Sequence, residues 1–194
     1  YVMQGVDWND PTVENLARAR NQHQVEVILD LVLENENQMF IQPLVNENPE
    51  HVLGILQHPR TLATFSDSGA HVCQEMGSSL QTHMLNYWVR QKQAFTLETA
   101  VRMLTLDNAL AWDIVGRGLV RKNYAADLVL FEESRIRPQI PKVQHDLPGG
   151  APRLVQKSEG IAYTVVNGQV TLENGSVTGK LSGQVVKGRL TSTH

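Results

Sequence analysis

The stretch TLATFSDSGAHV, residues 61–72, joins an apolar run to a sudden group of polar side chains. Its first five residues, TLATF, have the length and apolar content of a short buried strand. In parallel α/β folds, functional groups lie at the carboxyl ends of strands, where a carboxylate can bind a metal ion and accept a proton from its water. Asp67 stands at that position. The local pattern alone favours a plainer interpretation, in which Asp67 caps a following helix.

The region before this stretch alternates between helix and strand patterns. Residues 12–35 predict a helix that starts at Asp10-Pro11 and breaks near Asn21. MFIQPLV (39–45) predicts a short buried strand, and residues 49–58 predict a short helix. Four apolar residues at helical spacing are expected to face the core: Val25, Ile28, Leu29 and Val32. This alternation is typical of parallel α/β architecture.

Residues 80–112 predict further helices, and the second of them can be capped by Thr96. After Gly116 the pattern becomes one of short strands separated by turns. The pair Asn167-Gly168 lies between β-branched residues, which predicts a hairpin with a type I′ turn. A segment rich in Pro and Gly, residues 135–154, is expected to form an ordered loop.

We therefore expect two domains, residues 1–115 with α/β units and residues 116–194 with a β fold. The chain has 194 residues, a net charge of −3 and no Lys/Arg run, which argues against a nucleic-acid or anionic-membrane surface. No apolar stretch approaches the ~20 residues of a membrane span. The single cysteine, Cys73, excludes an internal disulfide and favours a reducing compartment, so we expect a cytoplasmic protein.

Several stretches in the right order resemble one enzyme family. HPRTLATFSDSGAH (58–71) and LNYWVRQKQAFTLETAVRMLT (85–105) are similar to the final barrel strand and following helices of the amidohydrolase superfamily, in particular its N-acyl-D-amino-acid deacylase (D-aminoacylase-like) branch. Three later stretches resemble the C-terminal β domain of that branch: GRGLVRKNYAADLVLF (116–131), HDLPGGAPRLVQ (145–156) and VVNGQVTLENGSVTGKLSGQVVKGR (165–189).

The resemblance implies an α/β fold, the C-terminal part of a (β/α) TIM-like barrel followed by a small β-sandwich domain. It implies a metal-dependent hydrolase of C–N amide bonds in N-acyl (D-)amino acids, with one or two zinc ions. We also expect a homo-oligomer, because the predicted strands MFIQPLV and TLATF would have open hydrogen-bonding edges that another copy could cover. Asp67 corresponds to the strand-8 aspartate, which binds the metal and passes a proton from its water to the departing nitrogen. Ser68, Gly69 and His71 are expected to contact the substrate, although His71 can equally be a polar residue of the loop.

Other features depart from the family pattern. The seven histidines include no HxH pair, and one aspartate cannot hold a catalytic zinc, which takes at least three protein ligands. A complete barrel needs at least ~200 residues. The chain also opens at YVMQGVDWND, without an initiator Met or signal-like segment. We therefore expect a C-terminal portion of a longer enzyme, inactive by itself.

Two alternative functions stay open at this point. One is a cyclic-amide hydrolase of the hydantoinase or dihydroorotase type, because Asp67 serves both reactions. The segment CQEMGSS (73–79) contains no arginine of the kind expected around a substrate carboxylate, which leaves the substrate undecided. The other is a metal-less relative that serves as a scaffold or interaction module.

Overall fold

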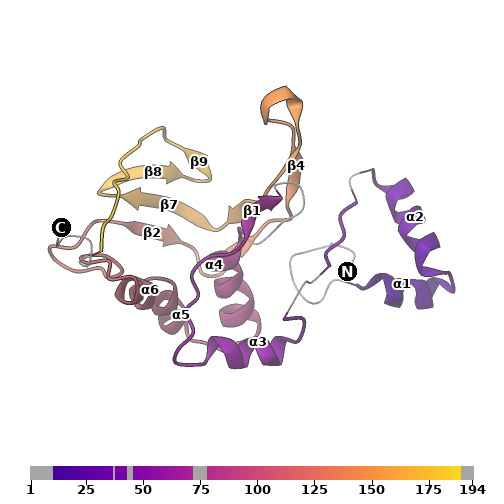
Figure 1. Cartoon of the computed structure of the whole chain (residues 1–194), viewed down its shortest axis with the longest axis horizontal. Helices are drawn as coiled ribbons and strands as arrows, with labels where there is room; N and C mark the ends of the chain where they lie inside the picture. The colour runs from indigo at the N-terminus through magenta and orange to yellow at the C-terminus, as the bar shows by residue number, and fades with distance from the viewer. Residues whose placement is uncertain (1–10, 37, 43–45, 72–77, 189–194) are drawn as a thin grey trace. The chain divides into compact units, whose positions relative to one another are not determined.

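The computed structural model describes residues 11–36, 38–42, 46–71 and 78–188, without the side chain of His71 (Figure 1). The chain divides into two compact units, Tyr1–Val52 and Leu53–His194. The described residues combine helices with antiparallel sheet, so the mixed helix-and-sheet character agrees with the sequence prediction. The barrel-and-sandwich arrangement and the boundary near residue 115 stay predictions. None of the helices in these ranges has the length and apolar character needed to cross a bilayer.

The first unit contains a pair of helices, α1 (Val13–Arg20) and α2 (Gln24–Glu34). The predicted break near Asn21 is confirmed: Asn21 has φ 51°, and its N–H bonds to carbonyls at the end of α1. The predicted helix start at Asp10-Pro11 is wrong, because α1 begins at Val13. Thr12 is the N-cap, and its hydroxyl accepts the Asn15 N–H at 3.0 Å, whereas Asp10 lies outside the described residues.

The predicted core-facing stripe of α2 is wrong. Val27 and Leu31 are the buried residues, and they pack with Ala17 of α1. The four residues of the predicted stripe are between 38% and 57% exposed: Val25, Ile28, Leu29 and Val32. Because α2 carries apolar residues on two sides and α1 covers only one of them, helical periodicity could not decide which side is buried.

The region between these helices and the site differs partly from the sequence prediction. Of the predicted strand 39–45, residues 43–45 lie outside the described part, and Phe40 makes an isolated β-bridge. The short helix is confirmed as α3 (Pro49–Leu56), where the Asn48 Oδ1 atom accepts the Glu50 N–H at 2.8 Å. The predicted strand TLATF is wrong. Residues 61–67 are irregular and a strand, β1, covers Ser68–His71. A strand forms through pairing with its neighbours, and within the described residues 61–65 have no ladder partner.

The predicted helices after residue 80 are confirmed in the second unit. They are α4 (Leu80–His83), the π-helix η1 (Met84–Gln91), α5 (Leu97–Leu104) and α6 (Leu106–Ala111). Thr96 caps α5 as expected, since its Oγ1 atom accepts the Thr99 N–H at 3.2 Å. Buried residues of these helices form a core: Met84, Leu85, Tyr87, Trp88, Val89, Ala100 and Ala109.

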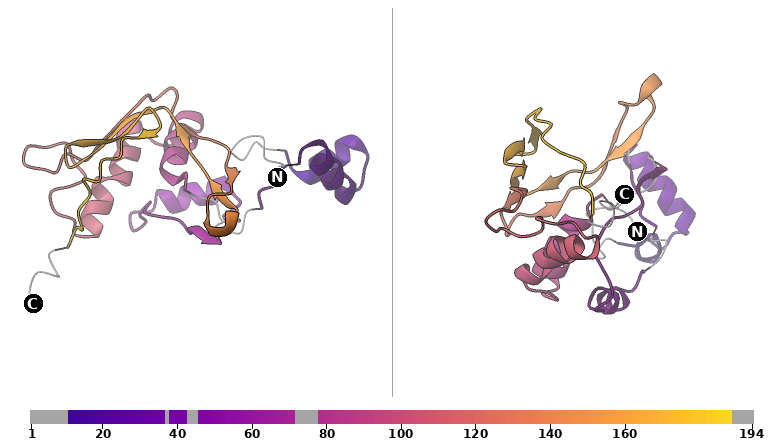
Figure 2. Two further views of the ribbon diagram at one scale, coloured as in Figure 1. Left: turned by 90° about the horizontal axis from the view of Figure 1, so that it is seen from above. Right: turned by 60° about the vertical axis from the view of Figure 1, so that its left-hand side comes forward.

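An antiparallel sheet with the order β2-β7-β8-β9 follows these helices (Figures 1 and 2). Its strands are β2 (Leu128–Phe131), β7 (Ile161–Val166), β8 (Gln169–Glu173) and β9 (Ser176–Val177). The predicted β7–β8 turn is confirmed, since Asn167 and Gly168 have φ of 47° and 78°, as a type I′ turn requires.

The segment between β2 and β7 is more regular than an ordered loop. It contains β3 (Arg137–Pro138), which pairs with β6 (Ser158–Glu159). It also contains β4 (Lys142–Gln144) and β5 (Arg153–Val155), which pair with each other across the short 3₁₀ turn η2 (Pro148–Gly150). In Figure 1 the β4–β5 hairpin projects beyond the sheet. We call residues 142–155 the arm.

An ion pair holds the start of the sheet in place. Arg117 pairs with Asp127, the residue directly before β2. The Asp127 carboxylate also accepts the Asn167 N–H at 2.8 Å, and the Asn167 side chain donates to the Ser182 carbonyl at 2.7 Å. Residues far apart in sequence are therefore joined around one carboxylate. Asn123, which precedes this ion pair, has φ 70°, a left-handed conformation that asparagine tolerates.

Candidate active site

The predicted site residues 67–69 lie in one tight turn immediately before and at the start of β1. The Asp67 carbonyl accepts the Ala70 N–H at 2.9 Å, and the Ser66 hydroxyl accepts the Ser68 N–H at 3.3 Å. Gly69 stands at the third position of the Asp67–Ala70 turn with φ 97°. A positive φ at that position is the requirement of a type II turn and explains the glycine.

The Asp67 side chain is exposed, and within the described residues its carboxylate has no hydrogen-bond or ion-pair partner. The helix-cap interpretation is not supported in this part of the chain, because β1 directly follows Asp67 and the N-cap of α4 is Ser79. The carboxylate is thus available to accept protons or to bind a cation.

Other predicted residues contribute less. Ser68 is exposed at the start of β1, and the position of a Gly69 Cβ has no atom within 4 Å, so the turn is open on that side. The side chain of His71 and all of Cys73 lie outside the described residues. Among the described residues, no three His, Cys, Asp or Glu side chains come together as a metal site. Asp67 could supply at most one ligand, so these residues by themselves do not fit a catalytic zinc, which takes at least three protein ligands.

A contact that the sequence does not indicate links this segment to α6. The Asn108 Nδ2 group donates to the carbonyl of Ala63 at 2.7 Å, although the two residues are 45 positions apart. Ala63 is buried, and it lies four residues before Asp67. No local pattern around Asn108 distinguishes it from an ordinary helical residue, so only the fold reveals the contact.

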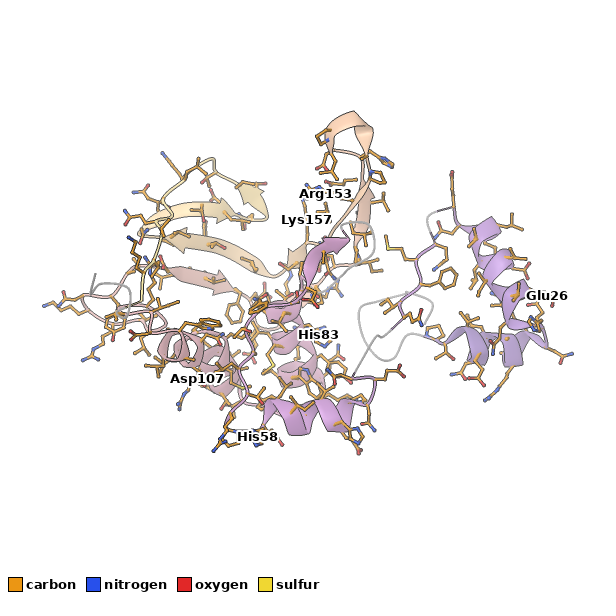
Figure 3. The ribbon with its side chains drawn as sticks, viewed as in Figure 1. Glu26, His58, His83, Asp107, Arg153 and Lys157 are labelled. Carbon is orange, nitrogen blue, oxygen red and sulfur yellow. The ribbon has the colours of Figure 1, made fainter. Side chains whose placement is uncertain are left out.

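His145 and Asp146 make hydrogen bonds within the arm. The Arg153 guanidinium donates to both carboxylate oxygens of Asp146, at 2.6 and 2.7 Å, and the hydrogen bond lowers the pKa of Asp146. The His145 Nδ1 atom lies 3.1 Å from the Gly150 carbonyl oxygen. Figure 3 labels Arg153 on this hairpin. Asp146 and Arg153 pair with each other, and His145 contacts a backbone carbonyl. The Asp67 carboxylate, in contrast, has no partner among the described residues.

Comparison with known proteins finds similarity to two curated enzymes, a deacylase and an aminoacylase. The chain is 28% identical over 151 residues to an N-acyl-D-aspartate deacylase of Alcaligenes xylosoxydans xylosoxydans, covering 77% of this chain and 25% of the relative. It is 26% identical over 129 residues to a D-aminoacylase of the same organism, covering 66% of this chain and 22% of that protein. The chain therefore spans about a quarter of the length of these curated relatives.

Solved structures of D-aminoacylase share the fold. One, described for the functional role of its binuclear metal center, superposes with a TM-score of 0.54 at 23% identity, over 91% of this chain and 34% of that one. A D-aminoacylase mutant in complex with copper chloride gives a TM-score of 0.53 at 24% identity, over 89% and 34% of the two chains. The predicted D-aminoacylase-like resemblance is thus confirmed. The sequence profile of the amidohydrolase family matches residues 2–172, and the chain belongs to this family.

Proposed function

We propose that the complete polypeptide is a metal-dependent amidohydrolase that hydrolyses the C–N amide bond of N-acyl amino acids, particularly those of D configuration. The observation that carries this proposal is the Asp67 carboxylate, exposed and without a described partner at the tight turn before β1. The names of the curated relatives, an N-acyl-D-aspartate deacylase and a D-aminoacylase, support the substrate class.

Asp67 is the proton shuttle in this proposal. It takes one proton from the attacking water as the new C–O bond forms at the amide carbonyl. It then gives that proton to the amide nitrogen as the C–N bond breaks, so that a carboxylic acid and a free amine leave. The Ser68 hydroxyl and the open side of Gly69 are proposed to contact the substrate, and His71 is a third candidate contact.

Asp67 is also proposed to be one ligand of zinc, with one or two ions in the complete enzyme. A bound metal ion would polarise the amide carbonyl and lower the pKa of the attacking water. Because a catalytic zinc takes at least three protein ligands, the others are proposed to come from parts of the complete polypeptide outside this chain. We further propose a homo-oligomer and a cytoplasmic location.

Substrate profiling of the full-length polypeptide tests the reaction. Purified protein is dialysed, analysed for zinc, and assayed with N-acetyl-D-amino acids, their L enantiomers and a hydantoin. The proposal expects release of the free D-amino acid and bound zinc. Turnover of the hydantoin alone would assign the cyclic-amide alternative. Absence of both zinc and turnover, in protein with a cooperative thermal melt, would leave the scaffold interpretation.

A further inference from the structure

We propose that Asn108 is a positioning residue for Asp67. The inference rests on the proposed function, because it concerns how the proton shuttle is held. Its starting point is the hydrogen bond from the Asn108 Nδ2 group to the Ala63 carbonyl, at 2.7 Å. This bond joins α6 to the irregular segment 61–67, which ends at the turn that carries Asp67.

The oxygen of the Asn108 side-chain amide does not contribute to folding stability. Its Oδ1 atom is buried and has no hydrogen-bond partner among the described residues. A buried unpaired acceptor costs folding free energy. Leucine has a similar shape and would remove that unpaired acceptor, while leaving the Ala63 carbonyl without its donor. The number of buried unpaired acceptors would stay the same, so stability alone gives no advantage to asparagine here.

The helix that presents Asn108 is itself held in place. Asp107, labelled in Figure 3, pairs with Arg102 of α5 at 2.9 Å. The chain at Gly118 passes so close to α6 that a Cβ there would lie 3.0 Å from the Ala109 side chain and from the Leu106 Cα atom. The Asn108 amide therefore projects from a fixed support onto the buried Ala63 backbone.

The segment that receives this bond needs such support. Residues 61–67 have no strand ladder among the described residues, so the regular pairing that aligns a strand is missing here. A hydrogen bond four residues before Asp67 restricts where the turn and its carboxylate lie. Because a misplacement of about 1 Å in a reacting group can cost ~10²-fold in rate, loss of this bond should affect turnover more than substrate binding.

A double-mutant cycle in the full-length polypeptide tests the inference, with an N-acetyl-D-amino acid as substrate. Asn108→Leu is expected to lower kcat by about 10²-fold, with KM and the thermal melt little changed. The matched control is the reverse exchange on the same helix, Leu110→Asn, at a side chain that is 67% exposed. It should leave kcat within a few-fold of the parent.

The second arm of the cycle separates positioning from a general structural effect. In the Asp67→Asn background, Asn108→Leu should cause no further loss, because the two residues act as a unit. Two results would overturn this inference while leaving the proposed function intact. One is an equal fold-loss of kcat from Asn108→Leu in the parent and in the Asp67→Asn background. The other is parent-like kcat for Asn108→Leu. If Asn108→Leu does not fold, the smaller Asn108→Ala also removes the donor, and parent-like kcat in that variant would overturn the inference. Parent-like kcat for Asp67→Asn would instead overturn the proposed function.

Discussion

Asp67 and Asp127 both stand directly before a β-strand, but their surroundings are opposite. The Asp127 carboxylate pairs with Arg117 and accepts the Asn167 N–H, and its side chain is 32% exposed. The Asp67 carboxylate is exposed and has no described partner. A carboxylate whose lone pairs are satisfied by fixed donors stabilises the fold, whereas one left free at a turn is available for chemistry. The same residue type at the same place in an element therefore has two different surroundings, and we propose that the two carboxylates have different roles.

The largest expected effect concerns turnover at Asp67. Asp67→Asn keeps the size of the side chain and removes the basic carboxylate, so kcat of the full-length polypeptide should fall by about 10²–10⁴-fold. The thermal melt should stay at the parent value, because the carboxylate has no described partner to lose. Asp30→Asn in α2 is the matched control, since that carboxylate accepts a hydrogen bond from Gln22 and has no part in the proposed site. An equal loss in the control would contradict a specific role.

Asp127 should show the reverse behaviour. Asp127→Ala removes the partner of Arg117 and the acceptor of the Asn167 N–H, and hydrogen bonds to charged groups contribute about 1.5–3 kcal/mol each. We expect the free energy of unfolding, measured by urea denaturation, to fall by at least about 1.5–3 kcal/mol. The pair of Asp107 and Arg102 offers a comparison, because the Arg102 side chain is 65% exposed whereas that of Arg117 is 22% exposed. Asp107→Ala should therefore cost at most about 1 kcal/mol. Equal losses at the two sites would remove the proposed distinction.

Gly69→Ala should have a smaller effect. The glycine has φ 97°, a conformation that costs a residue with a Cβ about 1–2 kcal/mol, although no atom stands within 4 Å of the new Cβ. Thermal melts should therefore show modest destabilisation. Gly54→Ala in α3 is the control, because it also has open space and lies in a helix, where alanine is favoured by about 1 kcal/mol. A stabilising Gly69→Ala change would refute the proposed turn geometry.

The smallest effect is expected in the arm at acid pH. The Arg153 hydrogen bond lowers the pKa of Asp146 in the folded state. The stabilisation is therefore fully present above the unfolded-state pKa of about 3.9. It is lost as the pH falls through the lower folded-state pKa. Amide exchange of Lys142–Gln144 should rise in that range, and Arg153→Gln should show the rise already at neutral pH. Unchanged exchange in the variant would show that the pair does not hold the arm.

Features set by neighbouring residues could be predicted from the sequence. The Asn167-Gly168 turn, the Thr96 cap and the break at Asn21 each depend on backbone preferences or a capping side chain within a few positions. Features set by distant partners could not. The buried side of α2 depends on what covers it, and the strand predicted at 61–65 needs neighbours that the described residues do not provide.

The candidate site shows the same division. Asp67 could be found because a carboxylate follows an apolar run, and because that pattern resembles a family. The Asn108 contact could not, because it joins positions 45 residues apart without a local signal. The free carboxylate itself was visible only in the structure, since the sequence pattern favoured a helix cap.

The most direct test of the central assignment is a structure of the full-length polypeptide with a non-hydrolysable analogue of an N-acyl-D-amino acid. We predict that an Asp67 carboxylate oxygen lies within about 2.6–3.2 Å of the atom that replaces the scissile nitrogen, or contacts it through one water. An analogue bound with its scissile group beyond the reach of Asp67, and beside a different acid or base, would contradict the account.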